Sequence, residues 1–115
     1  MTLIEQIYDE LAEQQLVHTQ WEFSEDWCNR SKDWFAHLRH RNREIGLLAQ
    51  IDLLKTIQSK KQIYTAWRQR DGRRMGWIIE EPLASLAKTE NQILISLHQR
   101  FGFQALPHQP LHTLC

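Results

Sequence analysis

An all-α fold of five to six helices in one compact domain is predicted by three features of the sequence. Apolar residues recur three or four positions apart along most of the chain, which is the spacing of one helix face. Residues that favour helix caps or turns separate these apolar stretches. The length of 115 residues and the 42% content of hydrophobic residues suit a single core. We therefore expect one helical domain over residues 1–102 and an irregular tail over residues 103–115, which holds Pro107 and Pro110.

The first helix is predicted to begin at Leu3, because Thr2 and Glu5 have the spacing of a capping box. In this motif the two side chains accept hydrogen bonds from backbone N–H groups that the first turn leaves free. The apolar stripe of this helix spans about four turns and comprises Leu3, Ile4, Ile7, Tyr8, Leu11, Ala12 and Leu16. The opposite face is acidic and carries Glu5, Asp9, Glu10 and Glu13.

A connection with two core aromatic residues is expected next. It runs from His18 to Phe23, with Trp21 and Phe23 turned inward. Ser24 then fits the N-cap of a short helix that ends at Cys28, since a serine hydroxyl can accept a hydrogen bond from the first turn.

A second short helix is predicted from Ser31 to His40, with Ser31 as its N-cap. Asn29 lies between the two short helices and is expected in the left-handed conformation, which asparagine tolerates better than most residues. The inward side of the second helix comprises Trp34, Phe35 and Leu38. The chain is expected to leave the helix near Asn42.

Two more helices are predicted before a turn signal at Asp71-Gly72. One runs from about Ile45 to Ile57, and the next is capped by Ser59. The apolar positions of the two helices include Leu48, Ile51, Leu54, Ile63, Tyr64 and Trp67.

Residues 73–79 form the least helical stretch and predict a short strand or an extended arm. After it, Pro82 suits a helix start and Gly102 a helix stop. The apolar residues between them predict one helix, or two with a restart at Thr89. The amphipathic stretch Leu86–Phe101 is a candidate dimerisation element.

The formal net charge of zero conceals an uneven distribution. Residues 1–29 carry seven acids and no lysine or arginine, whereas residues 30–74 carry twelve bases and four acids. Residues 75–115 carry two bases and three acids. Such asymmetry is typical of a chain with a polyanion-binding face. The alternative is that the acidic and basic elements pair with each other, within one molecule or across a dimer.

The sequence also indicates in which cellular compartment the protein is expected. No apolar run approaches the roughly 20 residues that a bilayer span requires. The first residues lack a basic start followed by an apolar stretch, so we expect no signal peptide. Two cysteines, Cys28 and Cys115, form a poor disulfide framework and suit a reducing compartment. The expected location is therefore the cytoplasm.

The sequence predicts two short helices separated only by Asn29-Arg30, which is the arrangement of a helix-turn-helix motif. The stretch from Phe23 to Phe35, Phe-Ser-Glu-Asp-Trp-Cys-Asn-Arg-Ser-Lys-Asp-Trp-Phe, resembles segments of small bacterial helix-turn-helix proteins. It is similar in particular to an uncharacterised bacterial family with the pattern Phe-Ser-x-x-Trp-Leu/Cys-Gly/Asn-Arg-Ser-x-x-Tyr/Trp. The resemblance covers about residues 20–57, and Asn29 stands in the turn where such motifs often have glycine.

The resemblance implies a transcription-regulator-like protein that reads duplex DNA through the helix at about residues 31–40. Ser31 and Lys32 would contact phosphates or base edges of the DNA. Arg39, Arg41 and Arg43 would contact the flanking DNA backbone. Arg73 and Arg74, on an extended arm, would add minor-groove or phosphate contacts, and the basic stretch Lys60–Arg74 would add electrostatic affinity. The implied DNA-binding residues are Arg30, Ser31, Lys32, Ala36, His37, Arg39, His40, Arg41, Arg43, Arg73 and Arg74. A homodimer would supply two half-site contacts.

Other functions remain open at this level. Residues 30–74 could instead form the basic face of a protein-interaction module that meets an acidic partner, including the first helix of a neighbouring copy. His37, His40 and Cys28 complete neither a metal-binding motif nor a nucleophile-and-base arrangement. Trp67 and Trp77 flank a basic stretch, which permits stacking on single-stranded nucleic acid but is more typical of core or interface packing. The sequence contains no complete set of catalytic residues, so an enzymatic function ranks below both binding functions.

Overall fold

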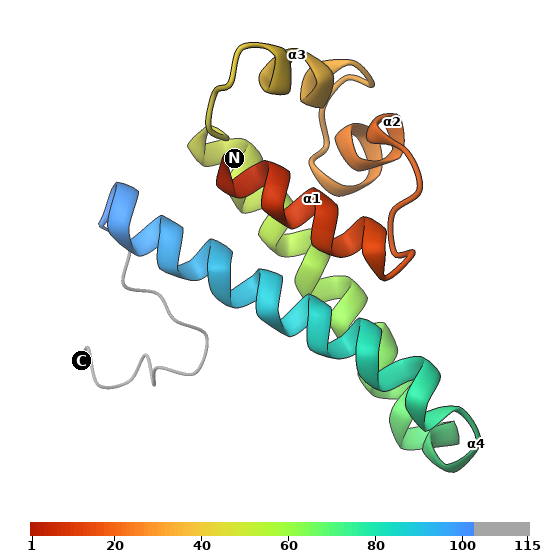
Figure 1. The fold of residues 1–115 in the computed structure, drawn as a ribbon. Coiled ribbons are helices and arrows are strands. Elements are labelled where there is room, and N and C mark those ends of the chain that lie inside the picture. Colours follow the sequence, from red (N-terminus) through yellow and green to blue (C-terminus); the bar gives the residue numbers. More distant parts are fainter. Residues whose placement is uncertain (103–115) are drawn as a thin grey trace.

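A computed structural model describes the backbone of residues 1–102 and the side chains of residues 1–70 and 78–102. It confirms the all-α class, because the described backbone forms five helical elements and no strand. α2 runs directly into the π-helical turn η1, and Figure 1 shows the short elements grouped at one end of a long helical hairpin. The elements are α1 (Leu3–Glu13), α2 (Gln20–Glu22), η1 (Phe23–Trp27), α3 (Trp34–His40) and α4 (Leu47–Phe101).

The long element α4 is a hairpin rather than a straight rod. Its 55 residues would measure about 80 Å in a straight helix, yet the longest extent of the molecule is 45 Å. Lys61 forms an ion pair with Glu90, and Arg68 forms one with Glu80. Residues later in the first half of α4 thus pair with residues earlier in the second half. The outgoing half (residues 47–70) and the returning half (residues 78–101) therefore lie antiparallel (Figure 1).

The reversal of α4 lies between Arg68 and Glu80, in the region of the turn predicted at Asp71-Gly72, but the strand or extended arm predicted at residues 73–79 is wrong. The backbone there is helical, and a helix satisfies its own N–H and C=O groups without a sheet partner. Pro82 lies inside α4 rather than at a helix start.

The core joins the short elements to the hairpin. α1 contributes Ile4, Ile7 and Leu11, and α4 contributes residues from both halves. Tyr8, Phe23 and Phe35 form an aromatic cluster beside them, with ring centroids 4.9 to 5.3 Å apart. The α4 residues of this core are Ala49, Leu53, Ile57, Leu86, Ile93 and Leu97.

Three expectations about apolar residues are corrected by this packing. Trp21 is 57% exposed, because residues 20–27 are helical and only the face with Phe23 and Trp27 meets the core. Leu48 is 70% exposed, because α4 buries Ala49 and Leu53 instead. The stretch Leu86–Phe101 is not a free dimerisation face, since its stripe packs inside the chain.

The helix ends confirm some predicted caps and correct others. The capping box of Thr2 and Glu5 is present. Thr19, not Ser24, caps the next helix by accepting from the N–H of Glu22. Ser31 is not an N-cap, because α3 begins at Trp34 and only the backbone oxygen of Ser31 accepts from it.

Left-handed residues end the short elements. Asn29 has φ 55° and Asn42 has φ 51°, which confirms the predicted turn and chain break. Gly102, with φ 73°, ends α4 as predicted. Gln15 also has a positive φ, 58°, after α1, and the sequence carries no signal for it. The Leu16 N–H donates to the oxygen of Leu11 there, as in a Schellman motif.

Candidate nucleic-acid interface

A basic surface lies over α3 and the turns on either side of it. Its members are the predicted contact residues that the structure finds exposed. They are Ser31, Lys32, Ala36, His37, Arg39, His40, Arg41 and Arg43. We refer to these eight residues as the basic surface. The structure thus brings together most of the predicted site within one continuous stretch of chain.

The position of α3 is set by buried and half-buried contacts beneath the basic surface. Phe35 is fully buried in the aromatic cluster. Its N–H, which is free at the start of α3, donates to the buried hydroxyl of Ser24 over 3.1 Å. Ser24 therefore joins η1 to α3, although it does not cap its own helix.

Arg30 anchors the turn between η1 and α3. Its guanidinium donates to the carboxylate of Asp52 on α4 over 3.1 Å and to the backbone oxygen of Asn29 over 2.8 Å. Both side chains of the Arg30–Asp52 pair are less than one third exposed. Arg30 is thus a structural tether as well as a predicted contact residue.

The cations of the basic surface differ in their surroundings. Arg39 pairs with Glu5 on α1 at 3.4 Å and lies over the ring of Phe35. Lys32 lies 4.9 Å from the ring centroid of Trp21. Within the described side chains, Arg41 and Arg43 have no acidic partner.

Two glutamates near this surface accept hydrogen bonds at the N-terminus of α1. The Glu44 carboxylate accepts from the N–H groups of Leu3 and Ile4 at 3.0 and 3.3 Å, and so caps α1 across the fold. Hydrogen bonds from Thr2, together with the charge of Arg39, lower the pKa of Glu5. Sequence reasoning missed the role of Glu44, because a cap from 40 residues away leaves no local pattern.

Cys28 lies under the surface and is fully buried. Burial raises the pKa of its thiol well above the ordinary value, so it packs as a small apolar side chain. Among the side chains that the structure describes, no three histidine, cysteine or acidic residues are grouped closely enough to hold a metal ion.

The second predicted basic stretch is separated from the first. Arg73 and Arg74 belong to the helical reversal of α4 and not to an extended arm, and their side chains lie outside the described part. The reversal and α3 lie at opposite ends of the molecule (Figure 1). Residues 31–43 and 73–74 therefore do not form one surface.

The comparison with protein families covers nearly all of the described chain. A family model matches residues 4–101, which include the basic surface and the whole α4 hairpin. The chain belongs to DUF6626, a family of unknown function. The DUF6626 match assigns no activity to these residues. Neither the search of curated proteins nor the search of solved structures finds a match.

Among the described residues, none of the DUF6626 helices combines the length and apolarity of a bilayer-crossing segment. α4 is long enough, but it folds back on itself and carries charged residues along both halves.

Proposed function

We propose that the basic surface binds duplex DNA and that α3 is the element that enters the major groove, as in a transcription-regulator-like protein. The observation that carries this proposal is the exposure of Arg41 and Arg43 without an acidic partner among the described side chains. Cations without a counter-charge are available to neutralise phosphates, which supplies most of the affinity of non-specific DNA binding.

The local geometry supports a helix-turn-helix mode of contact. A helical turn (η1), a left-handed residue (Asn29) and a short exposed helix (α3) follow each other, as in that motif. Ala36 is small and His37 can hydrogen-bond, so this face of α3 can approach base edges closely. Lys32 before α3 and Arg41 after it are placed to contact the phosphates on either side.

Acidic residues restrict how DNA can approach. Glu25 and Asp26 are exposed on η1, the element that precedes the turn. Carboxylates at that position repel phosphates, so the contact has to be centred on α3 and on residues 41–43. Neutralising Glu25 and Asp26 with glutamine and asparagine is expected to raise the affinity for duplex DNA.

The central test reverses the charges of Arg41 and Arg43. Fluorescence anisotropy with a random-sequence duplex at several salt concentrations measures the affinity of the full chain. In Arg41→Glu/Arg43→Glu, affinity should fall by about tenfold or more at low salt. The slope of log affinity against log salt should fall by about two, one for each lost phosphate contact. Arg39 is left intact in this test, because it pairs with Glu5.

The matched control is Lys55→Glu, which reverses an exposed cation on α4 outside the basic surface. It should change affinity far less than reversal of either arginine. Absence of duplex binding by the unmodified chain at low salt overturns the proposal. Equal losses in Lys55→Glu and in the arginine variants would also contradict it, since binding would then follow net charge alone. An acidic protein partner that requires Arg41 and Arg43 while DNA does not bind would favour the interaction-module alternative.

A further inference from the structure

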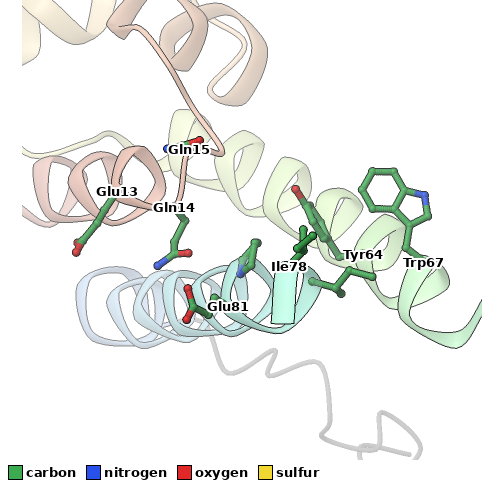
Figure 2. Close-up of a pocket in the computed structure, with 9 residues that line it drawn as sticks. Glu13, Gln14, Gln15, Tyr64, Trp67, Ile78 and Glu81 are labelled. Atoms are coloured by element: carbon green, nitrogen blue, oxygen red, sulfur yellow. The ribbon is translucent and has the colours of Figure 1, made fainter. Parts of the chain in front are cut away.

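A cleft of about 430 Å³ lies in the corner between the end of α1 and the α4 hairpin (Figure 2). Tyr64 and Trp67 line it from the outgoing half of α4, with ring centroids 5.1 Å apart and ring planes inclined at 67°. Ile78 lines it from the returning half. Trp67 and Ile78 are 40% and 44% exposed. One part of the cleft is therefore an apolar wall, with two aromatic rings, that is open to solvent.

The other part of the cleft is acidic. Glu13 at the end of α1 and Glu81 on the returning half of α4 line it. Figure 2 shows both carboxylates on the side of the cleft away from Trp67. Both glutamates are exposed, and neither forms an ion pair with a described side chain. The described residues that line the cleft include no lysine and no arginine.

The cation nearby, Lys88, is already paired with another glutamate. Its Nζ lies 2.8 Å from the carboxylate of Glu10 on α1. The hydrogen bond to Glu10 raises the pKa of Lys88, and the charge of Glu13 raises it further. The carboxylates of Glu10, Glu13 and Glu81 thus stand against one lysine at this corner of the described chain. A ligand that carries positive charge complements this excess of negative charge.

The acidic part of the cleft is held in place by contacts within the chain. Glu10 accepts hydrogen bonds from Ser85 over 2.9 Å and from Lys88 over 2.8 Å. These bonds attach the end of α1 to the returning half of α4, and Ser85 lies one helical turn after Glu81. A site whose parts are fixed in this way requires little ordering when a ligand binds.

We propose that the cleft binds an amphipathic organic cation, which is a protonated amine on a small aromatic or aliphatic body. The body packs on Trp67, Tyr64 and Ile78, and the ammonium group lies toward Glu13 and Glu81. Aromatic faces also attract cations, so the rings stabilise the charged end as well as the apolar end. The volume of the cleft lies within the range of about 300–1,000 Å³ that is typical of small-molecule sites.

This ligand site extends beyond the proposed function and does not depend on it. The cleft borders the hairpin beyond the end of α1, whereas α3 lies at the other end of the molecule (Figure 1). None of the eight residues of the basic surface lines the cleft. Ligand binding can therefore be measured without DNA, and its failure is distinct from a failure of DNA binding.

The first experiment follows the indole N–H signals of the full chain by two-dimensional NMR, with the signal of Trp67 assigned through Trp67→Phe. The probe is 2-phenylethylamine, and its neutral and anionic analogues are 2-phenylethanol and phenylacetate. The amine should shift the Trp67 signal in a saturable manner, with a dissociation constant about tenfold below that of the alcohol. Phenylacetate should bind most weakly. Trp21, which is 57% exposed and lies outside the cleft, is the internal control and should not shift.

The second experiment removes the charge of the cleft. Glu13→Gln/Glu81→Gln should raise the dissociation constant of the amine by about tenfold and leave that of the alcohol unchanged. Asp9→Asn is the matched control, because Asp9 is exposed on α1 outside the cleft. Trp67→Ala, followed at the backbone N–H of Gln15, should weaken the binding of both compounds. Far-UV circular dichroism checks that each variant stays folded.

Several results would overturn the proposal. The first is an amine that produces no saturable shift of the Trp67 signal, or that shifts Trp21 equally. Equal affinity for the amine and the alcohol would show that the carboxylates do not select the ligand. Equal losses in Asp9→Asn and in the double glutamine variant would show that the amine responds only to the overall charge of the chain.

Discussion

On the basic surface, Arg41 and Arg43 are exposed with no acidic partner among the described side chains, whereas Lys61 and Arg68 of the outgoing half of α4 pair with glutamates of the returning half. Lys61 donates to Glu90 over 2.6 Å, and Arg68 lies 3.5 Å from Glu80. The two regions belong to one basic segment of the sequence, so the number of charges does not explain the difference.

The difference comes from what the carboxylates bind. In the hairpin they lie opposite cations of the antiparallel half and neutralise them. Before α4, by contrast, Glu44 accepts from the N–H groups of Leu3 and Ile4. Glu5 accepts from Thr2 and also pairs with Arg39. A carboxylate at a helix N-terminus is stabilised by the helix dipole and by the free N–H groups. Glu44 caps α1 in this way and pairs with no cation among the described side chains, so it leaves the positive charge of Arg41 and Arg43 uncompensated.

The largest expected loss of stability comes from a core substitution that tests whether the two regions fold as one unit. Phe35→Ala removes a fully buried ring that contacts Tyr8 and Phe23, and should lower the free energy of unfolding by about 3–5 kcal/mol. Urea unfolding followed by circular dichroism and by tryptophan fluorescence measures the loss. Because one core joins α1, η1, α3 and α4, the two signals should change together.

The matched control for Phe35→Ala is Ile63→Ala on the hairpin. Ile63 is 43% exposed, so its truncation should lower the free energy of unfolding by less than about 1 kcal/mol. If Phe35→Ala abolished only the fluorescence change and left the helical signal of α4 with its original midpoint, the two regions would be independent.

A smaller effect is expected at the link between the regions. Glu10 on α1 accepts from Lys88 over 2.8 Å and from Ser85 over 2.9 Å, both on the returning half of α4. The hydrogen bond from Lys88, followed by that from Ser85, holds the pKa of Glu10 below its ordinary value of 4.5. Glu10→Gln should lower the free energy of unfolding by about 1 kcal/mol at neutral pH.

The sign of the pH dependence follows from the lowered pKa. A carboxyl that is more acidic in the folded chain contributes its full stabilisation above the unfolded value of 4.5 and loses it as the pH falls through the folded value. The difference between Glu10→Gln and the unmodified chain should therefore vanish in strong acid. Asp9→Asn, at an exposed position on the same helix, should change stability little at any pH. A difference that persists in acid would show that the ion pair is not its source.

Local signals in the sequence were sufficient for the fold class, for the capping box of α1, for the left-handed Asn29, for the break at Asn42 and for the end of α4 at Gly102. Each of these depends on residues within a few positions of each other. The serine caps at positions 24 and 31 were wrong. Thr19 caps the first of these helices and the hydroxyl of Ser24 accepts from Phe35 of α3 instead, while α3 begins only at Trp34, beyond Ser31. Glu44 as a cap of α1 could not be found without the fold.

The exposed part of the site was predicted better than its surroundings. The basic surface was foreseen because runs of arginine and histidine are rarely buried. The separation of the basic surface from Arg73 and Arg74 was not foreseen. It follows from the continuous helix of the outgoing half of α4, which holds residues 43 and 73 at its opposite ends. The tether between Arg30 and Asp52 likewise became evident only in three dimensions.

The smallest expected change in stability comes from substituting an asparagine in each of the two regions. Asn29 is left-handed in the turn before α3, whereas Asn91 is exposed within the returning half of α4. Asn29→Ala should lower the free energy of unfolding by about 1 kcal/mol, because alanine lacks the short polar side chain that lets asparagine tolerate the left-handed conformation. Asn29→Gly should change it by less than about 0.5 kcal/mol, because glycine has no Cβ. Asn91→Ala should be neutral or slightly stabilising, since alanine favours a helix. Urea midpoints of the three variants give the comparison, and equal effects at both positions would mean that the turn does not require its observed conformation.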